Sequence, residues 1–226
     1  MEFPLLLRNG KSWKAKILGE QALLLEAVDG SLEEVHNLVA AIEGASLEGI
    51  MDIVPAYNSL ALIFEEEVWN HTSLMQAISN LSTENLTKTA NQKLIEVPVC
   101  YELGLDWEEV TGFIGLSKEE VILQHSSVIY TVAMMGFIPG FVFLEGLSNG
   151  LTAPRRSEPR TNIPSGSVGI GGSQTGIYSL ESPGGWNIIG RTPTSFFDVT
   201  KSPPTNLKAG DRIRFRPISE EEFYHE

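Results

Sequence analysis

Apolar and polar positions follow two different periods along the first 92 residues. Short runs alternate with a period of two, which predicts strands, and longer runs repeat with a helical period. The clearest helix begins at Ser31, because Glu34 follows three residues later as in a capping box and apolar residues then recur on one face. The predicted strands are 13–18, 22–26, 51–54 and 60–64, and the predicted helices are 31–42 and 71–81. Strands interleaved with two helices predict a small α+β domain of the ferredoxin-like type.

The pattern changes after a polar stretch from Ser82 to Lys93, which has few large apolar residues and predicts a linker. We therefore predict two domains, 1–92 and 93–226. The second begins with a predicted strand at 96–101 and helices at 107–114 and 117–125. Helical periodicity then disappears, and short apolar runs alternate with Gly/Pro turns. These runs are 128–134, 167–170, 186–189, 196–199 and 212–215. They predict a mainly-β domain built as a closed antiparallel barrel.

Composition and charge exclude several classes of protein. The chain has 16 Lys+Arg against 29 Asp+Glu, a formal net charge of −13, which argues against a nucleic-acid partner. With 42% hydrophobic residues it is typical of a folded globular protein. Its one cysteine, Cys100, excludes an internal disulfide and is most simply a buried apolar group. No apolar run is long enough to span a membrane and the start lacks a signal-peptide pattern, so we expect a cytoplasmic protein.

Two partial motifs fail, and no metal site is predicted. Gly10-Lys11-Ser12 resembles the end of a phosphate loop, but Leu5 stands where that loop requires glycine. The segment 169–174 starts like a dinucleotide fingerprint and ends on Gln174 in a β context. The histidines are too widely spaced to form a metal-ligand pair.

Candidate chemistry is concentrated in a glycine-rich stretch. More than half of the 21 glycines lie between Gly136 and Gly190. The same stretch contains Arg155, Arg156, Arg160 and, at its end, Arg191. These arginines either bind an anion, for which the guanidinium group is well suited, or pair with neighbouring acids. The glycines either allow hairpins and bulges or let backbone N–H groups approach a ligand.

Three further features have either a functional role or a structural one. Gly184-Gly185 can expose consecutive backbone amides to an anion, and Trp186 can either stack on a flat ligand or pack in the barrel. His125, at a predicted helix end, is either a general acid/base or a capping or core histidine.

An ordered string of motifs between Gly136 and Pro193 resembles one protein family. The string comprises Gly136-Phe137-Ile138-Pro139-Gly140-Phe141, Pro154-Arg155, Pro159-Arg160, Ile163-Pro164-Ser165-Gly166-Ser167-Val168, Gln174-Thr175-Gly176-Ile177-Tyr178, Ser182-Pro183-Gly184-Gly185-Trp186 and Gly190-Arg191-Thr192-Pro193. It resembles the family of the 5-oxoprolinase B subunit, also called allophanate hydrolase subunit 1 or the sporulation kinase A inhibitor family. Weaker similarity extends over nearly the whole chain.

The resemblance implies a cyclophilin-like barrel for the second domain and a complex with 5-oxoprolinase subunits C and A. Such a complex would open 5-oxoproline to glutamate using ATP, with Mg²⁺ shared between subunits. From the chemistry we assign Arg155, Arg160 and Arg191 to phosphate or substrate carboxylate, and Gln174 and Trp186 to ligand binding. We further assign the Gly184 and Gly185 amides to an oxyanion and His125 to proton transfer.

The family names leave two alternatives open. The chain is either part of an enzyme or an inhibitor that binds a sensor histidine kinase and blocks its autophosphorylation. A third possibility is a component of an allophanate- or urea-metabolising amidohydrolase. The expected barrel alone does not indicate prolyl isomerase activity, because fold does not carry function.

Overall fold

The computed structural model describes residues 2–65, 71–83 and 92–225. It divides into two compact units, Met1–Gln92 and Lys93–Glu226. Most of the predicted linker, residues 84–91, lies outside the described residues. None of the described helices is long and apolar enough to cross a membrane.

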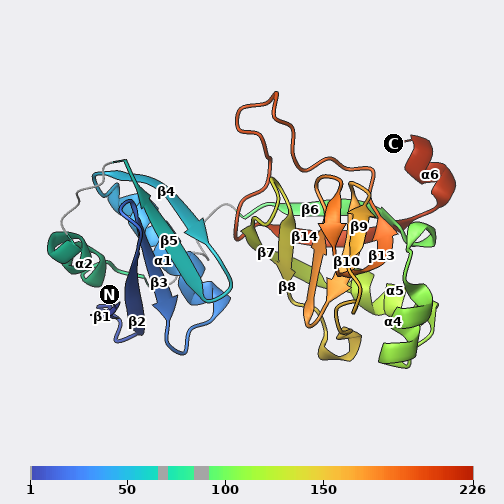
Figure 1. The fold of residues 1–226 in the computed structure, drawn as a ribbon, viewed down its shortest axis with the longest axis horizontal. Helices are drawn as coiled ribbons and strands as arrows, with labels where there is room; N and C mark the ends of the chain where they lie inside the picture. Colours follow the sequence, from blue (N-terminus) through green and yellow to red (C-terminus); the bar gives the residue numbers. More distant parts are fainter. Residues whose placement is uncertain (1, 66–70, 84–91, 226) are drawn as a thin grey trace. The chain divides into compact units, whose positions relative to one another are not determined.

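The first unit is an antiparallel sheet with helices (Figure 1). Its elements are β1 (Glu2–Leu6), β2 (Ser12–Leu18), β3 (Ala22–Ala27), α1 (Leu32–Ala45), β4 (Ile50–Pro55), β5 (Ser59–Phe64) and α2 (His71–Ser79), and the strand order is β1-β2-β3-β5-β4. The Ser31 hydroxyl accepts a hydrogen bond from the Glu34 N–H, which confirms the predicted cap. Buried Leu38 of α1 packs with Trp13 and Leu62 of the sheet. The ferredoxin-like designation stays a prediction.

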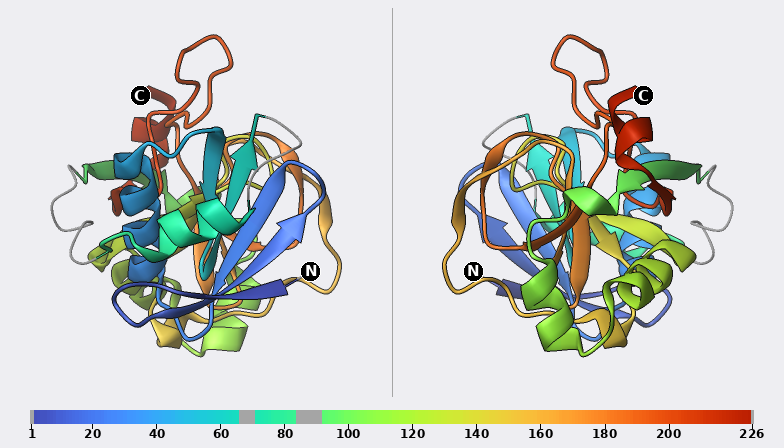
Figure 2. Two further views of the ribbon diagram at one scale, coloured as in Figure 1. Left: turned by 90° about the vertical axis from the view of Figure 1, so that its left-hand side faces the viewer. Right: turned by 90° about the vertical axis from the view of Figure 1, so that its right-hand side faces the viewer.

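The second unit is a closed barrel, which confirms the predicted mainly-β architecture. The barrel strands are β6 (Leu94–Cys100), β7 (Ile129–Met135), β8 (Val142–Glu145), β10 (Ser167–Gly171), β11 (Gln174–Ile177), β13 (Asn187–Arg191) and β14 (Arg212–Ile218), in the order β10-β11-β8-β7-β14-β6-β13. A separate two-stranded sheet pairs β9 (Arg160–Ile163) with β12 (Ser182–Gly184). The helical elements are η1 (Tyr101–Leu103), α4 (Trp107–Ile114), α5 (Lys118–Ser127), η2 (Asn149–Leu151) and α6 (Glu220–His225). Helices α4 and α5 lie side by side (Figures 1 and 2).

Two predictions about the barrel are wrong in detail. The pairing of β14 with β6 is parallel rather than antiparallel. A parallel pair needs a long connection between its strands, and these two are joined through all the other strands of the domain. The apolar run 196–199 is irregular rather than a strand. Phe196 fills the core at 6% exposure while Val199 is 80% exposed, so this apolar run does not belong to a sheet face. Figure 1 shows the segment between β13 and β14 as a long projecting loop.

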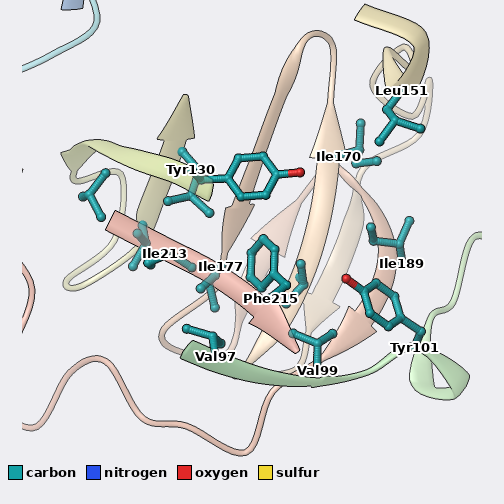
Figure 3. Close-up of a cluster of buried hydrophobic side chains, with 14 of the residues drawn as sticks. Val97, Val99, Tyr101, Tyr130, Leu151, Ile170, Ile177, Ile189, Ile213 and Phe215 are labelled. Atoms are coloured by element: carbon teal, nitrogen blue, oxygen red, sulfur yellow. The ribbon is translucent and has the colours of Figure 1, made fainter. Parts of the chain in front are cut away.

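Aliphatic and aromatic side chains fill the barrel interior (Figure 3). Ile170, Ile177, Ile213 and Phe215 are at most 1% exposed and point inward from three strands. Helix α5 packs against β14 and adds its buried face to this core.

A second buried cluster packs against the backbone of β10 and β11. It consists of Phe141, Ile163, Tyr178, Trp186 and Ile188. The Trp186 indole lies directly over Gly171 and Gly176, where an added Cβ would come within 2.6 Å and 3.1 Å of ring atoms respectively. Glycine is therefore required at these positions so that the indole can pack on the strand backbone.

Candidate functional site

The centre of the candidate site is Asp106, a fully buried carboxylate just before α4. Its loop is fixed to β13, because the backbone N–H groups of Leu105 and Asp106 both donate to the Ile188 carbonyl at 2.8 and 3.0 Å. The Ile188 N–H in turn donates to Asp106 Oδ2 at 2.7 Å. These backbone bonds hold the carboxylate in one orientation.

Two arginines complete the coordination of this carboxylate. Arg160 is bidentate, with Nη1 donating to Oδ2 at 2.7 Å and Nη2 to Oδ1 at 2.6 Å. Arg156 Nη1 donates to Oδ1 and also to Glu109 at 3.2 Å. A buried charge is tolerated only when it is paired and hydrogen-bonded, and this arrangement meets both conditions.

Both arginines keep N–H donors that Asp106 does not use. The Arg156 and Arg160 side chains are 23% and 25% exposed. Within the described part of the chain, the buried Nε of Arg156 has no hydrogen-bond partner. A guanidinium group has five N–H donors, so neither arginine is exhausted by its contacts with Asp106.

Arg155 and Trp186 lie beside this cluster. The exposed Arg155 guanidinium lies 5.8 Å from the centroid of the buried Trp186 ring. Tyr178 belongs with Trp186 to the buried apolar cluster described above, and burial raises the pKa of the Tyr178 hydroxyl although the Trp186 backbone N–H and the Arg155 charge act to lower it. Trp186 is therefore a core residue with a cation on one side, in agreement with the packing interpretation.

Gly184 and Gly185 are next to the arginines. Gly184 pairs with Arg160 across β12 and β9, and the Gly185 carbonyl accepts a hydrogen bond from the Arg156 N–H at 2.8 Å. A side chain at Gly184 would collide with the Tyr178 hydroxyl. Close packing explains Gly184, and the oxyanion role of the two amides stays a prediction.

His125 lies inside the barrel, apart from the arginines. It is 0% exposed and stacks on Phe215 at a centroid distance of 4.6 Å. Its Nδ1 is 2.8 Å from the Tyr101 hydroxyl and its Nε2 is 2.9 Å from the Thr175 hydroxyl. Because Thr175 donates to the Gly169 carbonyl at 3.0 Å, it accepts from Nε2–H, and Tyr101 donates to Nδ1.

This environment keeps His125 neutral. Burial lowers the pKa of His125 from 6.5 to about 3, because a buried imidazolium would lose its hydration. Figure 3 shows the Tyr101 hydroxyl pointing into the barrel toward this region. The geometry gives His125 the place of a core histidine, and its proton-transfer role has no geometric support.

Arg191 is also separated from Asp106. Arg191 lies three residues beyond Ile188 on β13, about 10 Å further along the strand. Its Nε donates to the Ser165 carbonyl at 2.8 Å, and its guanidinium lies 5.6 Å from the Phe223 ring centroid of α6. Gln174 is half-buried at the start of β11, paired with Gly171.

Sequence reasoning missed Asp106. The arginines have acidic neighbours within the glycine-rich stretch itself, whereas Asp106 comes from a segment 50 residues earlier than Arg156. An aspartate immediately before a predicted helix suggests only a helix cap. Its burial depends on the contact with β13, which sequence periodicity does not reveal.

The comparisons with known proteins agree with the motifs. The family model "Carboxyltransferase domain, subdomain C and D" matches residues 13–207. The 5-oxoprolinase B subunit of Bacillus subtilis is 40% identical over 224 residues, covering 92% of this chain and 93% of the relative. The protein of the same name from Haemophilus influenzae is 42% identical over 188 residues, covering 82% and 88%.

Longer proteins contain a similar region. The structure of the protein TTHA0988 has a TM-score of 0.76 and 33% identity, covering 88% of this chain but only 40% of that one. A urea amidolyase from Lachancea kluyveri is 41% identical over 242 residues, covering 90% of this chain and 13% of the relative. With the family model matching most of its length, the chain belongs to the family of carboxyltransferase domains, subdomains C and D.

Proposed function

We propose that this chain is the B subunit of an ATP-dependent 5-oxoprolinase, which opens the lactam of 5-oxoproline to L-glutamate together with subunits A and C. The observation that carries the proposal is the nearly full-length similarity to the B subunit of the Bacillus subtilis enzyme. The arginine cluster around Asp106 supports it, because both the substrate carboxylate and phosphate groups are anions that guanidinium groups bind well.

The chemical difficulty of the reaction is the amide. A lactam carbonyl is a poor electrophile, and transfer of the γ-phosphoryl group from ATP to its oxygen would activate the carbon for attack by water. The ring nitrogen would then leave as the amine, and hydrolysis of the resulting acyl phosphate would give glutamate and inorganic phosphate. Such a transfer mainly requires positioning and compensation of negative charge. The chain would contribute Arg155 and the outer N–H groups of Arg156 and Arg160, which Asp106 holds in fixed positions.

The remaining parts of the site would come from elsewhere. Among the described residues, no group of three or more His, Cys, Asp or Glu side chains could hold a metal ion. Mg²⁺ would be held mainly by the phosphates of the nucleotide, within the composite site. His125 would act indirectly, by fixing Tyr101 and Thr175 inside the barrel. We accordingly propose a composite site that is inactive without its partners.

Arg155 is the cleanest residue with which to test the proposal. Arg160→Ala would leave the Asp106 carboxylate buried without its bidentate partner, so its effect on activity would include misfolding. The exposed Arg155 guanidinium contacts the face of Trp186, and Arg155→Ala leaves the Asp106 pairs intact. A charge-assisted hydrogen bond contributes about 1.5–3 kcal/mol, so kcat/KM should fall by about 10- to 100-fold.

The assay is ATP-dependent glutamate release from 5-oxoproline by the chain mixed with subunits A and C. Arg214→Ala is the matched control, since that arginine forms a pair with Glu96 on the surface of the barrel at 3.6 Å. Release that needs this chain, falls with Arg155→Ala and is kept with Arg214→Ala supports the proposal. Release that does not require this chain contradicts it.

The similarity to urea amidolyase favours one alternative, a urea-derived substrate. Incubation of the same mixture with urea or allophanate in place of 5-oxoproline decides between them, with ammonia release as the readout, because only the true substrate would be consumed. Affinity purification from native lysate distinguishes these two enzyme functions from the remaining alternative, inhibition of a kinase. Recovery of subunits A and C favours the enzyme, and recovery of a sensor histidine kinase favours the inhibitor.

A further inference from the structure

The charge balance of the arginine cluster around Asp106 distinguishes a carboxylate ligand from a phosphate ligand. Asp106 and Glu109 both accept hydrogen bonds from Arg156, and Asp106 also binds Nη1 and Nη2 of Arg160. These two carboxylates balance the charges of two guanidinium groups. Arg155 is the third, and among the residues that the structure describes it forms no ion pair. The ion-paired cluster therefore keeps one positive charge.

Two further acids lie near the cluster in the chain, and neither adds to its positive charge. Glu108 and Glu158 are exposed, and within the described part of the chain they form no ion pair. Water screens exposed charges strongly, so these carboxylates act on the Arg155 guanidinium only weakly. Any effect that they do have reduces the positive charge further. The cluster thus suits an anion with a single charge.

The triphosphate of ATP needs more than this cluster provides. It carries several negative charges, and proteins commonly bind it with a glycine-rich loop, a lysine and a metal ion. The partial phosphate loop of this chain, Gly10-Lys11-Ser12, has Leu5 where the first glycine is required, and it belongs to the first unit. Among the described residues, no group of three or more His, Cys, Asp or Glu side chains could hold a metal ion. These features argue against binding of the nucleotide phosphates at the cluster.

A carboxylate matches the cluster in charge and in shape. The planar fork of a guanidinium group binds a carboxylate through two parallel hydrogen bonds. Arg160 shows this geometry with Asp106, at 2.7 and 2.6 Å. The Arg155 guanidinium is exposed, and among the described residues its side chain forms no hydrogen bond. Its fork is therefore available to a carboxylate from outside the chain.

Trp186 holds the Arg155 guanidinium beside the cluster. The centroid of its ring is 5.8 Å from that guanidinium, and a cation is attracted to the face of an indole. Trp186 is 5% exposed and directly follows Gly185, whose carbonyl accepts a hydrogen bond from the Arg156 N–H at 2.8 Å. The backbone that carries the two arginines is thus bound to the segment that carries the ring. Arg155 therefore loses little conformational freedom when it binds an anion.

We infer that Arg155, beside Arg156 and Arg160, binds the carboxylate of the lactam substrate, and that the phosphates of ATP bind elsewhere in the complex. This inference deepens the proposed function and rests on it, because 5-oxoproline supplies the carboxylate. It also specifies the substrate class, a small molecule with one carboxylate. Urea is uncharged and does not satisfy the site.

Steady-state kinetics of the complex with subunits A and C distinguish the two anions. A contact with the substrate carboxylate is equally strong in the bound substrate and in the transition state, so its loss raises KM and leaves kcat unchanged. A contact with the phosphates strengthens as charge moves during phosphoryl transfer, so its loss lowers kcat and raises the KM for ATP. Arg155→Ala removes the contact, and Arg155→Lys keeps the charge without the fork.

Arg155→Ala should raise the KM for 5-oxoproline by at least about 10-fold and leave kcat and the KM for ATP within about 2-fold of the wild type. Arg155→Lys should have an intermediate KM for 5-oxoproline. Arg214→Ala, which changes the arginine paired with Glu96, is the matched control and should change none of these constants. An increase in the KM for ATP, or an unchanged KM for 5-oxoproline, in Arg155→Ala overturns the inference.

Equilibrium binding of labelled 5-oxoproline gives a readout that does not depend on turnover. The measurement uses the complex with a non-hydrolysable ATP analogue, and the competitor is 2-pyrrolidinone, the same lactam without the carboxylate. In the wild type, 2-pyrrolidinone should compete at least about 10-fold more weakly than unlabelled 5-oxoproline, and this difference should largely disappear in Arg155→Ala. Equal competition by the two lactams in the wild type overturns the inference.

The outcomes for the proposed function are distinct. 5-Oxoproline that binds the complex through Arg155 without conversion to glutamate contradicts the proposed function and supports the inference. Glutamate release with an unchanged KM for 5-oxoproline in Arg155→Ala contradicts the inference alone. A wild-type complex that neither binds nor converts 5-oxoproline contradicts both.

Discussion

His125 and Asp106 are both fully buried, and they satisfy their polar atoms in opposite ways. His125 is neutral and joined to two hydroxyl groups, whereas Asp106 is charged and joined to two guanidinium groups and a backbone N–H. The sequence alone indicates Arg155, Arg160 and Trp186 as candidate site residues. It leaves His125 with two interpretations, of which burial in the core is one. The structure decides between them, because the residue pattern of a helix face is the same whether that face packs against a core or binds a ligand.

The neutral His125 predicts a pH dependence of folding. Its folded-state pKa of about 3 lies below the ordinary value of 6.5, so the unfolded chain takes up the proton first as the pH falls. The contribution of His125 to stability is therefore complete above pH 6.5 and is lost as the pH falls from there toward 3. The expected slope is about 1.4 kcal/mol per pH unit.

Urea unfolding between pH 7.5 and 4.5 measures this slope. Glutamine does not titrate, so the stability of His125→Gln should depend less steeply on pH than that of the wild type. The expected difference in slope is about 1.4 kcal/mol per pH unit. His225→Gln, which changes an exposed histidine of α6, should keep the wild-type slope. Equal slopes for the wild type and His125→Gln would show that the pKa of His125 is not lowered in the folded state.

The ion pairs of the buried Asp106 predict a second effect of a single residue on stability. Asp106→Asn keeps the shape of the side chain but leaves Arg156 and Arg160 without their shared counter-charge. Breaking a buried ion pair by changing one partner costs about 3–5 kcal/mol. We expect a loss of unfolding free energy of that size in urea titrations. Asp198→Asn, at the exposed pair with Lys201, should leave the unfolding midpoint unchanged, and equal effects of both variants would contradict this account.

At the scale of elements, the long periodic segments were predictable and the short strands were not. The helices predicted at 31–42 and 117–125 depend on local bonds: the structure confirms the N-cap bond at Ser31 and the complete capping box of Ser117 and Glu120. Strands β8, β9, β11 and β12 are only three or four residues long and carry no repeating pattern. The parallel pairing of β6 with β14 is likewise a long-range contact that local sequence does not encode.

Two glycine-to-alanine variants distinguish an effect of packing on stability from an effect of backbone entropy. Gly171→Ala would place a Cβ 2.6 Å from the Trp186 ring, so the indole must shift and stability should fall by about 1–3 kcal/mol. Gly112→Ala, in α4 with open space around it, should raise stability by about 1 kcal/mol. Thermal unfolding of the two variants checks both signs. A gain in stability for Gly171→Ala would show that the indole does not pack on this strand.

At the scale of the whole molecule, each unit has its own hydrophobic core. Residues 93–226 expressed alone should therefore unfold cooperatively in urea and keep the lowered pKa of His125, because its hydrogen bonds and ring stacking lie within this unit. Carbon chemical shifts of the imidazole ring, followed as a function of pH, report this pKa. A non-cooperative transition of the fragment would mean that the first unit is needed for its folding.

The central claim for the whole molecule is that the chain belongs to a complex that activates a lactam oxygen with ATP. 5-Oxoproline labelled with ¹⁸O at the lactam carbonyl tests it most directly, with the chain, subunits A and C, and ATP. If the lactam oxygen accepts the phosphoryl group, loss of the ring nitrogen gives an acyl phosphate, and attack of water at its carbon releases that oxygen as part of phosphate. We predict ¹⁸O in the released inorganic phosphate, in a reaction that requires this chain. Label retained entirely in glutamate, with unlabelled phosphate, would contradict the account.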